Sequence, residues 1–390
     1  MASLKKRIEY LLKHNTFIQF MYKHIISAIL RFAGIFIRTD DKLVLFNSFG
    51  GRKYNDSPKV IFESMRADER FKNNVFVWAF EKPEQFNIPG ARSIKIDTWE
   101  YFKTALKAKV WISSVNIERG LHFKKKNTIY INTWHGAGTK KIGNACNGRK
   151  DYNFSAVDMM LVQSEFEREI FERDFLCKPQ AIRKIGFPRN DELFHITQDQ
   201  KRAFREQFNI PEDKKVILYA PTWRDSKDGG LSYEFIPPLH IDKWKKMLSD
   251  EYVMLFRMHT FTTKFDMHFD EFARNVSDYE NLNHILAITD VLVTDYSTIV
   301  YDAAIANIPF ICFGFDYDSY SKERGFYYDL NNEYPGGVLV TEQDVIDRII
   351  GVNNEGAIDE YRDFRNKYIE AGGSATKQIL DELADKLNKK

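Results

Sequence analysis

Short β-rich runs alternate with helical stretches through most of the 390-residue chain, and this alternation constrains the fold more than any other feature. The pattern occupies residues 42–164 and restarts at residue 215. The β-rich runs are KLVLFNS, NVFVWAF, VWISS, TIYINTW and MMLVQS in the first series, and KVILYAP, YVMLFRM, VLVTD and PFICFGF in the second. Strands that alternate with helices pair in parallel, and the helices cover both faces of the sheet. The sequence therefore predicts an α/β fold of two doubly wound domains that face each other across a cleft.

The restart of the pattern sets the expected domain boundaries. Residues 41–195 form an N-terminal domain and residues 196–355 a C-terminal domain, close to the typical domain size of about 150 residues. We expect residues 356–390 to form C-terminal helices that close the structure or cross back to the first domain.

Residues 1–40 combine long apolar side chains with lysines and arginines throughout. The uncharged runs are far shorter than the roughly 20 residues that a transmembrane helix needs, and no signal-peptide cleavage site follows them. We expect a basic amphipathic helix or helical hairpin that lies on an anionic membrane surface. The alternative is an N-terminal helix packed on its own domain.

The bulk composition excludes several classes of function. Lys and Arg number 57 against 55 for Asp and Glu, and a net charge of +2 does not suit a protein that coats nucleic acid. Cys146, Cys177 and Cys312 lie far apart without a CxxC pair, which indicates a reducing cytosol and neither a disulfide framework nor a zinc knuckle. No phosphate-loop motif, GxGxxG or HExxH occurs. No metal site is predicted, although Mg²⁺ remains possible because residues 316–318 read DYD, a pattern also typical of solvated loop acids.

Four polar stretches follow expected strands, where open α/β sheets gather their ligands. They are TWHGAGTKK, YAPTWRDS, RMHTF and VTDYSTIVYDAA. In the last of them Ser297 and Thr298 precede a helix, whose first N–H groups and positive dipole end suit phosphate. Ordinary helix capping by Ser297 is the alternative.

Two histidines, His135 and His259, occupy equivalent positions at strand ends in the two domains. A neutral histidine accepts a hydroxyl proton and a protonated one stabilises oxyanions, so the pair suits phosphoryl transfer. The turn after His135 contains Gly136, Gly138, Lys140 and Lys141, and a flexible basic turn of this kind suits an anion. Each histidine alone is more often structural, and exposed loop charge explains the lysines equally well.

Taken in order, these stretches resemble the CDP-glycerol glycerophosphotransferase family that builds teichoic acids. The motifs are WHG followed by KKIG, GFPRND, YAPTWRD, R-x-H, TDYSTIVYDAA and RGFYYD, and the earlier FNSFGGRKYNDSPKVIFE looks like the acceptor-side segment. The sequence departs from the family at HGAGTKK, at Thr260 after R-x-H, and at YST. The resemblance implies a GT-B fold of two Rossmann-like domains, with the acceptor in the first and the CDP-polyol donor in the second.

The resemblance also implies roles for individual residues. His135 would deprotonate an acceptor hydroxyl that attacks the β-phosphorus of CDP-glycerol, so that CMP leaves. His259, Arg257, Ser297 and Thr298 would hold the diphosphate, Arg324 would add charge, Asp302 would bind a hydroxyl of ribose or glycerol, Thr222 and Arg224 would line the nucleotide pocket, and Gly136, Gly138, Lys140 and Lys141 would form the acceptor and phosphate loop.

The implied acceptor is a saccharide linked to polyprenyl diphosphate, used in wall teichoic acid synthesis by a peripheral enzyme on the cytoplasmic face of the cell membrane. The short chain resembles members that add the first one or few units, and oligomer formation is possible. Open alternatives are a CDP-ribitol ribitolphosphotransferase or a capsule polymer transferase of the same family, a GT-B sugar-nucleotide glycosyltransferase, and a membrane-bound scaffold with an inactive cleft.

Overall fold

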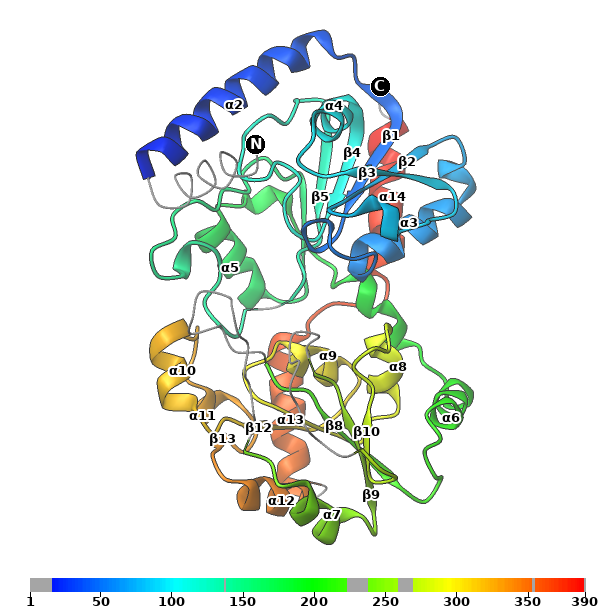
Figure 1. The fold of residues 1–390 in the computed structure, drawn as a ribbon, viewed down its shortest axis with the longest axis vertical. Helices are drawn as coiled ribbons and strands as arrows, with labels where there is room; N and C mark the ends of the chain where they lie inside the picture. Colours follow the sequence, from blue (N-terminus) through cyan, green and yellow to red (C-terminus); the bar gives the residue numbers. More distant parts are fainter. Residues whose placement is uncertain (1–15, 137, 223–237, 259–268, 353–354, 389–390) are drawn as a thin grey trace.

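The computed structural model describes residues 16–136, 138–222, 238–258, 269–352 and 355–388. They form two lobes, one above the other in Figure 1, and each lobe is built around one parallel β-sheet. The expected α/β fold with two parallel sheets is therefore confirmed.

The N-terminal lobe contains a seven-stranded sheet with the order β3-β2-β1-β4-β5-β6-β7, and every adjacent pair is parallel. The strands are β1 (Asp40–Asn47), β2 (Val75–Phe80), β3 (Ala91–Lys95), β4 (Ala108–Ser113), β5 (Ile129–Asn132), β6 (Met159–Val162) and β7 (Ile182–Lys184). The middle strands are buried on both faces, which explains their nearly continuous apolar sequences.

Helices cover both faces of this sheet. Alternate strand residues point to opposite sides, so Leu45 and Val77 face one helical layer while Phe46 and Trp78 face the other. The first layer comprises α2 (Thr16–Phe36), α4 (Trp99–Lys107) and α5 (Glu165–Phe175), and the second comprises α3 (Asp56–Ala67) and α14 (Ala375–Asn388).

The C-terminal lobe repeats the plan with a six-stranded parallel sheet of order β10-β9-β8-β11-β12-β13. Its strands are β8 (Lys215–Tyr219), β9 (Tyr252–Phe256), β10 (Ala273–Asn275), β11 (Val291–Thr294), β12 (Phe310–Phe313) and β13 (Val338–Leu339). One face is covered by α6 (Gln198–Gln207), α8 (Leu282–Ala287), α9 (Ile299–Ile305) and α13 (Glu355–Tyr368), and the other by α7 (Ile241–Leu248) and α12 (Glu342–Ile350). Two short helices, α10 (Tyr317–Arg324) and α11 (Leu330–Glu333), lie between β12 and β13.

The chain crosses between the lobes twice. The first crossing includes the 3-10 helix η6 (Pro188–Phe194), and the second joins α13 to α14, which packs on the N-terminal lobe (Figure 1). The crossings touch, because a Cβ atom on Gly186 would lie 2.6 Å from the Cα atom of Gly372. Asp191 in η6 accepts hydrogen bonds from the first backbone N–H groups of α14, at Ala375 and Thr376. The last helix therefore secures the connection between lobes.

Helix α2 lies along the outer edge of the N-terminal lobe (Figure 1). Its inner side packs through Leu30, which is 3% exposed. Its outer side exposes Ile18, Phe20, Met21, Tyr22, Ile25, Ile29, Phe32, Ile35 and Phe36. Within the described part of the chain, no helix has the length and apolar character required to cross a bilayer.

Candidate functional site

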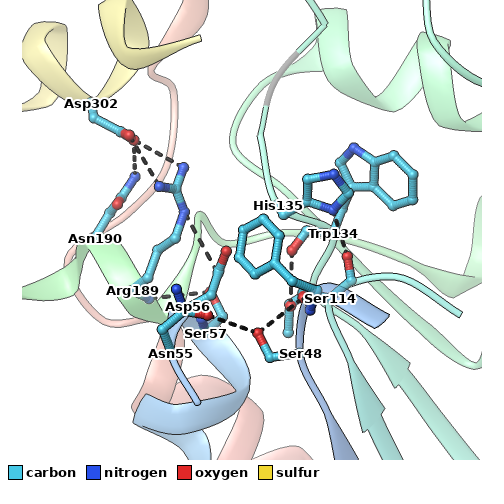
Figure 2. Close-up of polar contacts among 12 residues, drawn as sticks. Ser48, Asn55, Asp56, Ser57, Ser114, Trp134, His135, Arg189, Asn190 and Asp302 are labelled. Carbon is cyan, nitrogen blue, oxygen red and sulfur yellow. Dashed lines mark hydrogen bonds and ion pairs between the residues drawn. The ribbon is translucent and has the colours of Figure 1, made fainter. Parts of the chain in front are cut away.

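The site lies where segments that follow β1, β4 and β5 meet the crossing η6 and the start of α9 (Figure 2). Polar side chains from both lobes come together there. All strands of a parallel sheet point the same way, so the segments that follow them lie along one edge of the sheet even when they are far apart in the sequence.

A strained turn positions His135 directly after β5. Trp134 has φ of +49°, a left-handed conformation that is unfavourable for a bulky residue. The side chain of Asn132 compensates, since its Oδ1 atom accepts a 2.9 Å hydrogen bond from the Trp134 N–H and its Nδ2 atom donates to the carbonyl of Val115. The turn places the imidazole beside the Trp134 ring and against the Ser114 carbonyl (Figure 2).

The hydrogen bond to Ser114 fixes the tautomer of His135. Nδ1 lies 2.7 Å from the Ser114 carbonyl oxygen, which only accepts, so Nδ1 carries the proton and Nε2 keeps a lone pair. The hydroxyl of Ser114 accepts a hydrogen bond from the N–H of Phe49, whose ring lies 5.2 Å from the imidazole. These contacts fix the orientation of the ring and leave Nε2 as the nitrogen that can accept a proton.

The surroundings also keep His135 neutral. Burial lowers the pKa of His135 below its ordinary value of 6.5, and the cations Arg189 and Arg52 lower it further. The Ser114 carbonyl and the carboxylate of Asp56 act in the opposite direction. The net lowering means that the ring is unprotonated at neutral pH.

The turn after His135 touches the start of α9. A Cβ atom on Gly136 would lie 3.0 Å from the Thr298 hydroxyl oxygen, so the two motifs are neighbours across the junction. Thr298 immediately precedes α9, and the hydroxyl of Ser297 lies 3.4 Å from the Ile299 nitrogen. The structure thus brings together His135, Gly136, Ser297 and Thr298, as the sequence predicted for a single site.

The lysine-containing part of the turn pairs with the C-terminal lobe. The Lys141 N–H donates to the Gly325 carbonyl and the Tyr327 N–H donates to the Thr139 carbonyl, both at 3.1 Å. A Cβ atom on Gly138 would meet both Ile170 and Tyr327 within 3 Å. This pairing places Lys140 and Lys141 beside α10, at whose end the exposed Arg324 lies.

Asp302 has partners different from those that the resemblance implied. It is 4% exposed, and its carboxylate accepts two 3.0 Å hydrogen bonds from Arg189 and one of 2.7 Å from Asn190 (Figure 2). Asp302 therefore forms an ion pair with Arg189, and its expected bond to a hydroxyl of ribose or glycerol stays a prediction.

Two other expected donor residues lie at strand ends of the C-terminal lobe. The N–H of Thr222, after β8, donates to the carboxylate of Asp295 at 2.8 Å. Arg257, after β9, donates from Nη1 to the carbonyls of Val276 and Tyr279, and burial lowers its pKa. Hydrogen bonds from Arg257 to a diphosphate would therefore come from its other guanidinium nitrogens, Nε and Nη2.

Two expected site residues, His259 and Arg224, lie outside the described residues. Among the residues that are described, no group of three or more His, Cys, Asp or Glu side chains is arranged to hold a metal ion. Asp316 accepts a hydrogen bond from the Tyr296 hydroxyl at 2.8 Å and precedes α10.

Four residues of the site were not assigned roles from the sequence: Ser114, Asp56, Arg189 and Glu167. Asp56 and Arg189 lie in the motifs NDS and GFPRND, which carried the resemblance without indicating a role. Glu167 is fully buried in α5, and burial raises its pKa to about 8. Ser114 contributes a backbone carbonyl, which no side-chain pattern reveals.

Two lobes, each built around one parallel sheet, and a polar junction between them define a two-domain fold of the GT-B-like class. The chain belongs to the CDP-glycerol:poly(glycerophosphate) glycerophosphotransferase family, whose model matches residues 29–384. The expected family and the enzyme class, a CDP-glycerol glycerophosphotransferase of wall teichoic acid synthesis, are therefore confirmed.

Individual relatives agree. The chain is 35% identical over 76% of its length to a teichoic acid poly(glycerol phosphate) polymerase of Staphylococcus epidermidis, of which it spans 44%. It is 32% identical over 84% of its length to a teichoic acid glycerol-phosphate transferase of Staphylococcus aureus, of which it spans 86%. The solved structure of the wall teichoic acid polymerase TagF aligns with this chain over 98% of each of the two chains, at 29% identity and with a TM-score of 0.81. The structure of a histidine-to-asparagine variant of TagF soaked with CDPG aligns equally well.

Proposed function

We propose that this protein transfers glycerol phosphate from CDP-glycerol to a hydroxyl of a saccharide linked to polyprenyl diphosphate, with release of CMP. The observation that carries this proposal is the tautomer of His135, whose Nδ1 donates to Ser114 and leaves Nε2 unprotonated, while the adjacent Gly136 lies against Thr298 at the start of α9. A base in that position suits an acceptor hydroxyl held by one lobe and a phosphate held by the other.

The reaction requires one proton transfer and one displacement at phosphorus. The acceptor oxygen bonds to the β-phosphorus of CDP-glycerol while its proton passes to Nε2 of His135. The bond from the β-phosphorus to the bridging oxygen breaks, and that oxygen leaves as part of CMP. Phosphoryl transfer depends chiefly on alignment and charge stabilisation, so the protein needs no covalent intermediate.

Charge stabilisation at the diphosphate is the proposed role of the C-terminal lobe. Ser297 and Thr298 offer hydroxyl groups beside the turn that carries His135. We assign His259 and Arg257 to the same diphosphate on the basis of their motif, and Thr222 and Arg224 to the nucleotide. Lys140 and Lys141 face the same junction from the turn and would attract acceptor phosphates.

The acceptor carries a lipid, so the enzyme must work at a membrane surface. The nine exposed apolar side chains of α2 form a face that lies on the outside of the N-terminal lobe (Figure 1). Insertion of this face into the acyl boundary would attach the protein to the cytoplasmic leaflet as a peripheral enzyme. The N-terminal lobe would then lie next to the membrane-anchored acceptor.

The deciding experiment supplies purified protein with CDP-glycerol or CDP-ribitol and a lipid-diphosphate disaccharide, with and without EDTA. We expect CMP and a product heavier by one or more glycerol phosphate units. Turnover of CDP-ribitol alone would identify a ribitolphosphotransferase, and release of a nucleoside diphosphate from a sugar nucleotide would identify a glycosyltransferase. Donor binding without turnover in the presence of several acceptors would contradict the proposal and favour a scaffold.

A further inference from the structure

Arg189, in the crossing helix η6, contacts side chains of both lobes. Its guanidinium makes a paired contact with Asp302 of α9, from Nη1 to Oδ2 and from Nη2 to Oδ1, each at 3.0 Å (Figure 2). Its Nε atom lies 3.8 Å from a carboxylate oxygen of Asp56, at the start of α3 in the N-terminal lobe. One partly buried cation therefore lies between a carboxylate from each lobe.

The backbone around Arg189 strengthens this connection. The Arg189 N–H donates to the hydroxyl of Ser57 in α3 at 3.2 Å, while the adjacent Asn190 donates to Asp302 at 2.7 Å. Asp56 itself has φ of +62°, so the start of α3 is held in a strained conformation. Both lobes are thus attached to the same two residues of η6.

The two carboxylates that Arg189 contacts, Asp302 and Asp56, both lie near the groups proposed to take part in the reaction. Asp302 lies one turn into α9 from Thr298, which touches the turn carrying His135. Asp56 and Arg189 are both near enough to His135 to change its pKa. A shift of α9 relative to α3 would therefore change the distance between the base and the hydroxyl groups of Ser297 and Thr298.

We propose that Arg189 is a positioning residue for the transfer reaction, which sets the spacing between His135 and the start of α9 through its paired contact with Asp302 and its proximity to Asp56. This role rests on the proposed function, since the spacing matters only if the base and the phosphate belong to one reaction. The planar guanidinium suits the role because it binds a carboxylate through two parallel hydrogen bonds, whereas a lysine offers a single point charge.

The charge of Arg189 has a second effect on the base. Within the part of the chain that the structure describes, the charged groups that shift the pKa of His135 are Arg52 after η1 (Phe49–Gly51), Asp56 at the start of α3 and Arg189 in η6, while the Ser114 carbonyl accepts from Nδ1. Loss of the Arg189 cation leaves the carboxylate of Asp56 to favour the protonated imidazole. The acidic limb of kcat would then move to higher pH.

The test compares Arg189→Met and Arg189→Lys with a matched control, Arg183→Met. Arg183 makes an equally good paired contact, with Glu382 of α14, but within the N-terminal lobe and away from His135. For each variant, kcat with CDP-glycerol and the lipid acceptor is measured from pH 5 to 9, donor Kd is measured by calorimetry without acceptor, and folding is checked by thermal melting.

We expect Arg189→Met to lower kcat by about 100-fold, because a loss of alignment of this kind typically has that effect. Its donor Kd is expected to change by less than about 3-fold. Its acidic limb is expected to move up by about 0.5 to 1 pH unit. Arg189→Lys retains the charge, so we expect a smaller fall of about 10-fold and an acidic limb like that of the wild type. Arg183→Met is expected to resemble the wild type in both measurements.

Equal losses of donor affinity and kcat in Arg189→Met would overturn the proposal, because they indicate direct contact with the donor. An unmoved acidic limb in that variant would also overturn it. If Arg189→Met does not fold, Asp302→Asn is tested instead. We expect this variant to have a lowered kcat and an unchanged donor Kd, and the acidic limb of its kcat profile is not expected to move to higher pH. Failure of the wild type to turn over CDP-glycerol would instead contradict the proposed function, before any variant is compared.

Discussion

The carbonyl oxygen of Ser114 lies 2.7 Å from Nδ1 of His135, and this contact joins the ends of β4 and β5. A carbonyl cannot donate, so the contact selects the tautomer whose Nε2 accepts a proton. The geometry of two adjacent strands therefore determines which imidazole nitrogen is available to accept a proton.

We expect His135→Asn to lower kcat by about 10²- to 10⁴-fold, the usual contribution of a general base, while the donor Kd changes little. The exposed His240, which contacts Glu342 of α12, provides the control, and His240→Asn is expected to retain wild-type kcat. Single-turnover kinetics with CDP-glycerol separate the chemical step from binding. Retention of more than a tenth of the wild-type kcat in His135→Asn would remove His135 from the role of base.

The pH dependence of the wild type follows from the same residue. Burial is the largest cause of the lowered pKa of His135, and the base works only when it is neutral. We therefore expect kcat to rise with pH through a pKa below 6.5 and to show no further dependence on His135 between pH 7 and 8. An acidic limb centred above pH 7 would show that the imidazole is stabilised as a cation in the complex.

Alternation of strands and helices predicted the centre of each sheet but not its edges. The β-rich runs included β1, β2, β4, β5 and β6 of the first sheet and β8, β9, β11 and β12 of the second. The missed strands are the four edge strands β3, β7, β10 and β13, of two to five residues each. Edge strands bury fewer side chains, so their sequences lack the continuous apolar runs that mark buried parallel strands.

The site was predictable where it depends on one local segment. Gly136, Gly138 and His135 belong to one turn after a recognisable strand, and that turn does meet Thr298. The contact of Arg189 with Asp302 was not predictable, because it joins segments on different lobes. Local patterns locate the strand ends but contain no information about which distant charges form pairs.

Gly138→Ala tests how tightly the turn is held between the lobes. The added Cβ atom would lie 2.8 Å from Ile170 and 2.9 Å from Tyr327, so one of them must move. We expect a loss of about 1–3 kcal/mol in the free energy of unfolding, typical of overpacking, together with reduced kcat. Gly356→Ala in α13 is the control, since nothing lies within 4 Å of its added Cβ and alanine favours a helix. Equal melting temperatures for Gly138→Ala and the wild type would contradict the close contact.

Helix α2 supplies a test of membrane attachment. Phe32 and Phe36 are 64% and 73% exposed, and their rings contact each other at 5.2 Å on the outer side of the helix. We expect the double variant Phe32→Ser and Phe36→Ser to lower the fraction of protein that sediments with vesicles containing anionic lipid by several-fold, because apolar burial drives interfacial binding. Ile350→Ser removes a 59% exposed apolar side chain from the C-terminal lobe and is expected to leave sedimentation unchanged. Equal sedimentation of the double variant and the wild type would exclude α2 as the attachment site.

Glu167 gives a prediction about stability and pH. The side chain is 1% exposed in α5, and burial raises its pKa from an ordinary value of 4.5 to about 8. Below pH 4.5 the carboxyl is protonated in both the folded and the unfolded chain. Between pH 4.5 and 8 the unfolded chain releases this proton while the folded chain retains it, so stability from this group falls as the pH rises.

Glu167→Gln removes this dependence because glutamine has the size of a protonated glutamate and does not ionise. The hydrogen bond from the Gln163 N–H, 2.7 Å in the wild type, can persist on the new amide oxygen. We expect the variant to match the wild type near pH 5 and to exceed it by about 4 kcal/mol near pH 8.5 in the free energy of unfolding, because each unit of the raised pKa corresponds to about 1.4 kcal/mol.

The control is Glu165→Gln on the same helix. A hydrogen bond from Lys184 is the largest cause of the lowered pKa of Glu165, so this carboxylate stabilises the folded chain at pH values above its pKa. Its removal is expected to lower the melting temperature slightly at pH 8.5, the opposite sign to Glu167→Gln. Melting curves of both variants and the wild type, recorded from pH 5 to 9, measure these opposite effects. A lower melting temperature for Glu167→Gln at pH 8.5 would mean that the buried carboxylate is ionised there and is stabilised by the Gln163 N–H and by Arg189.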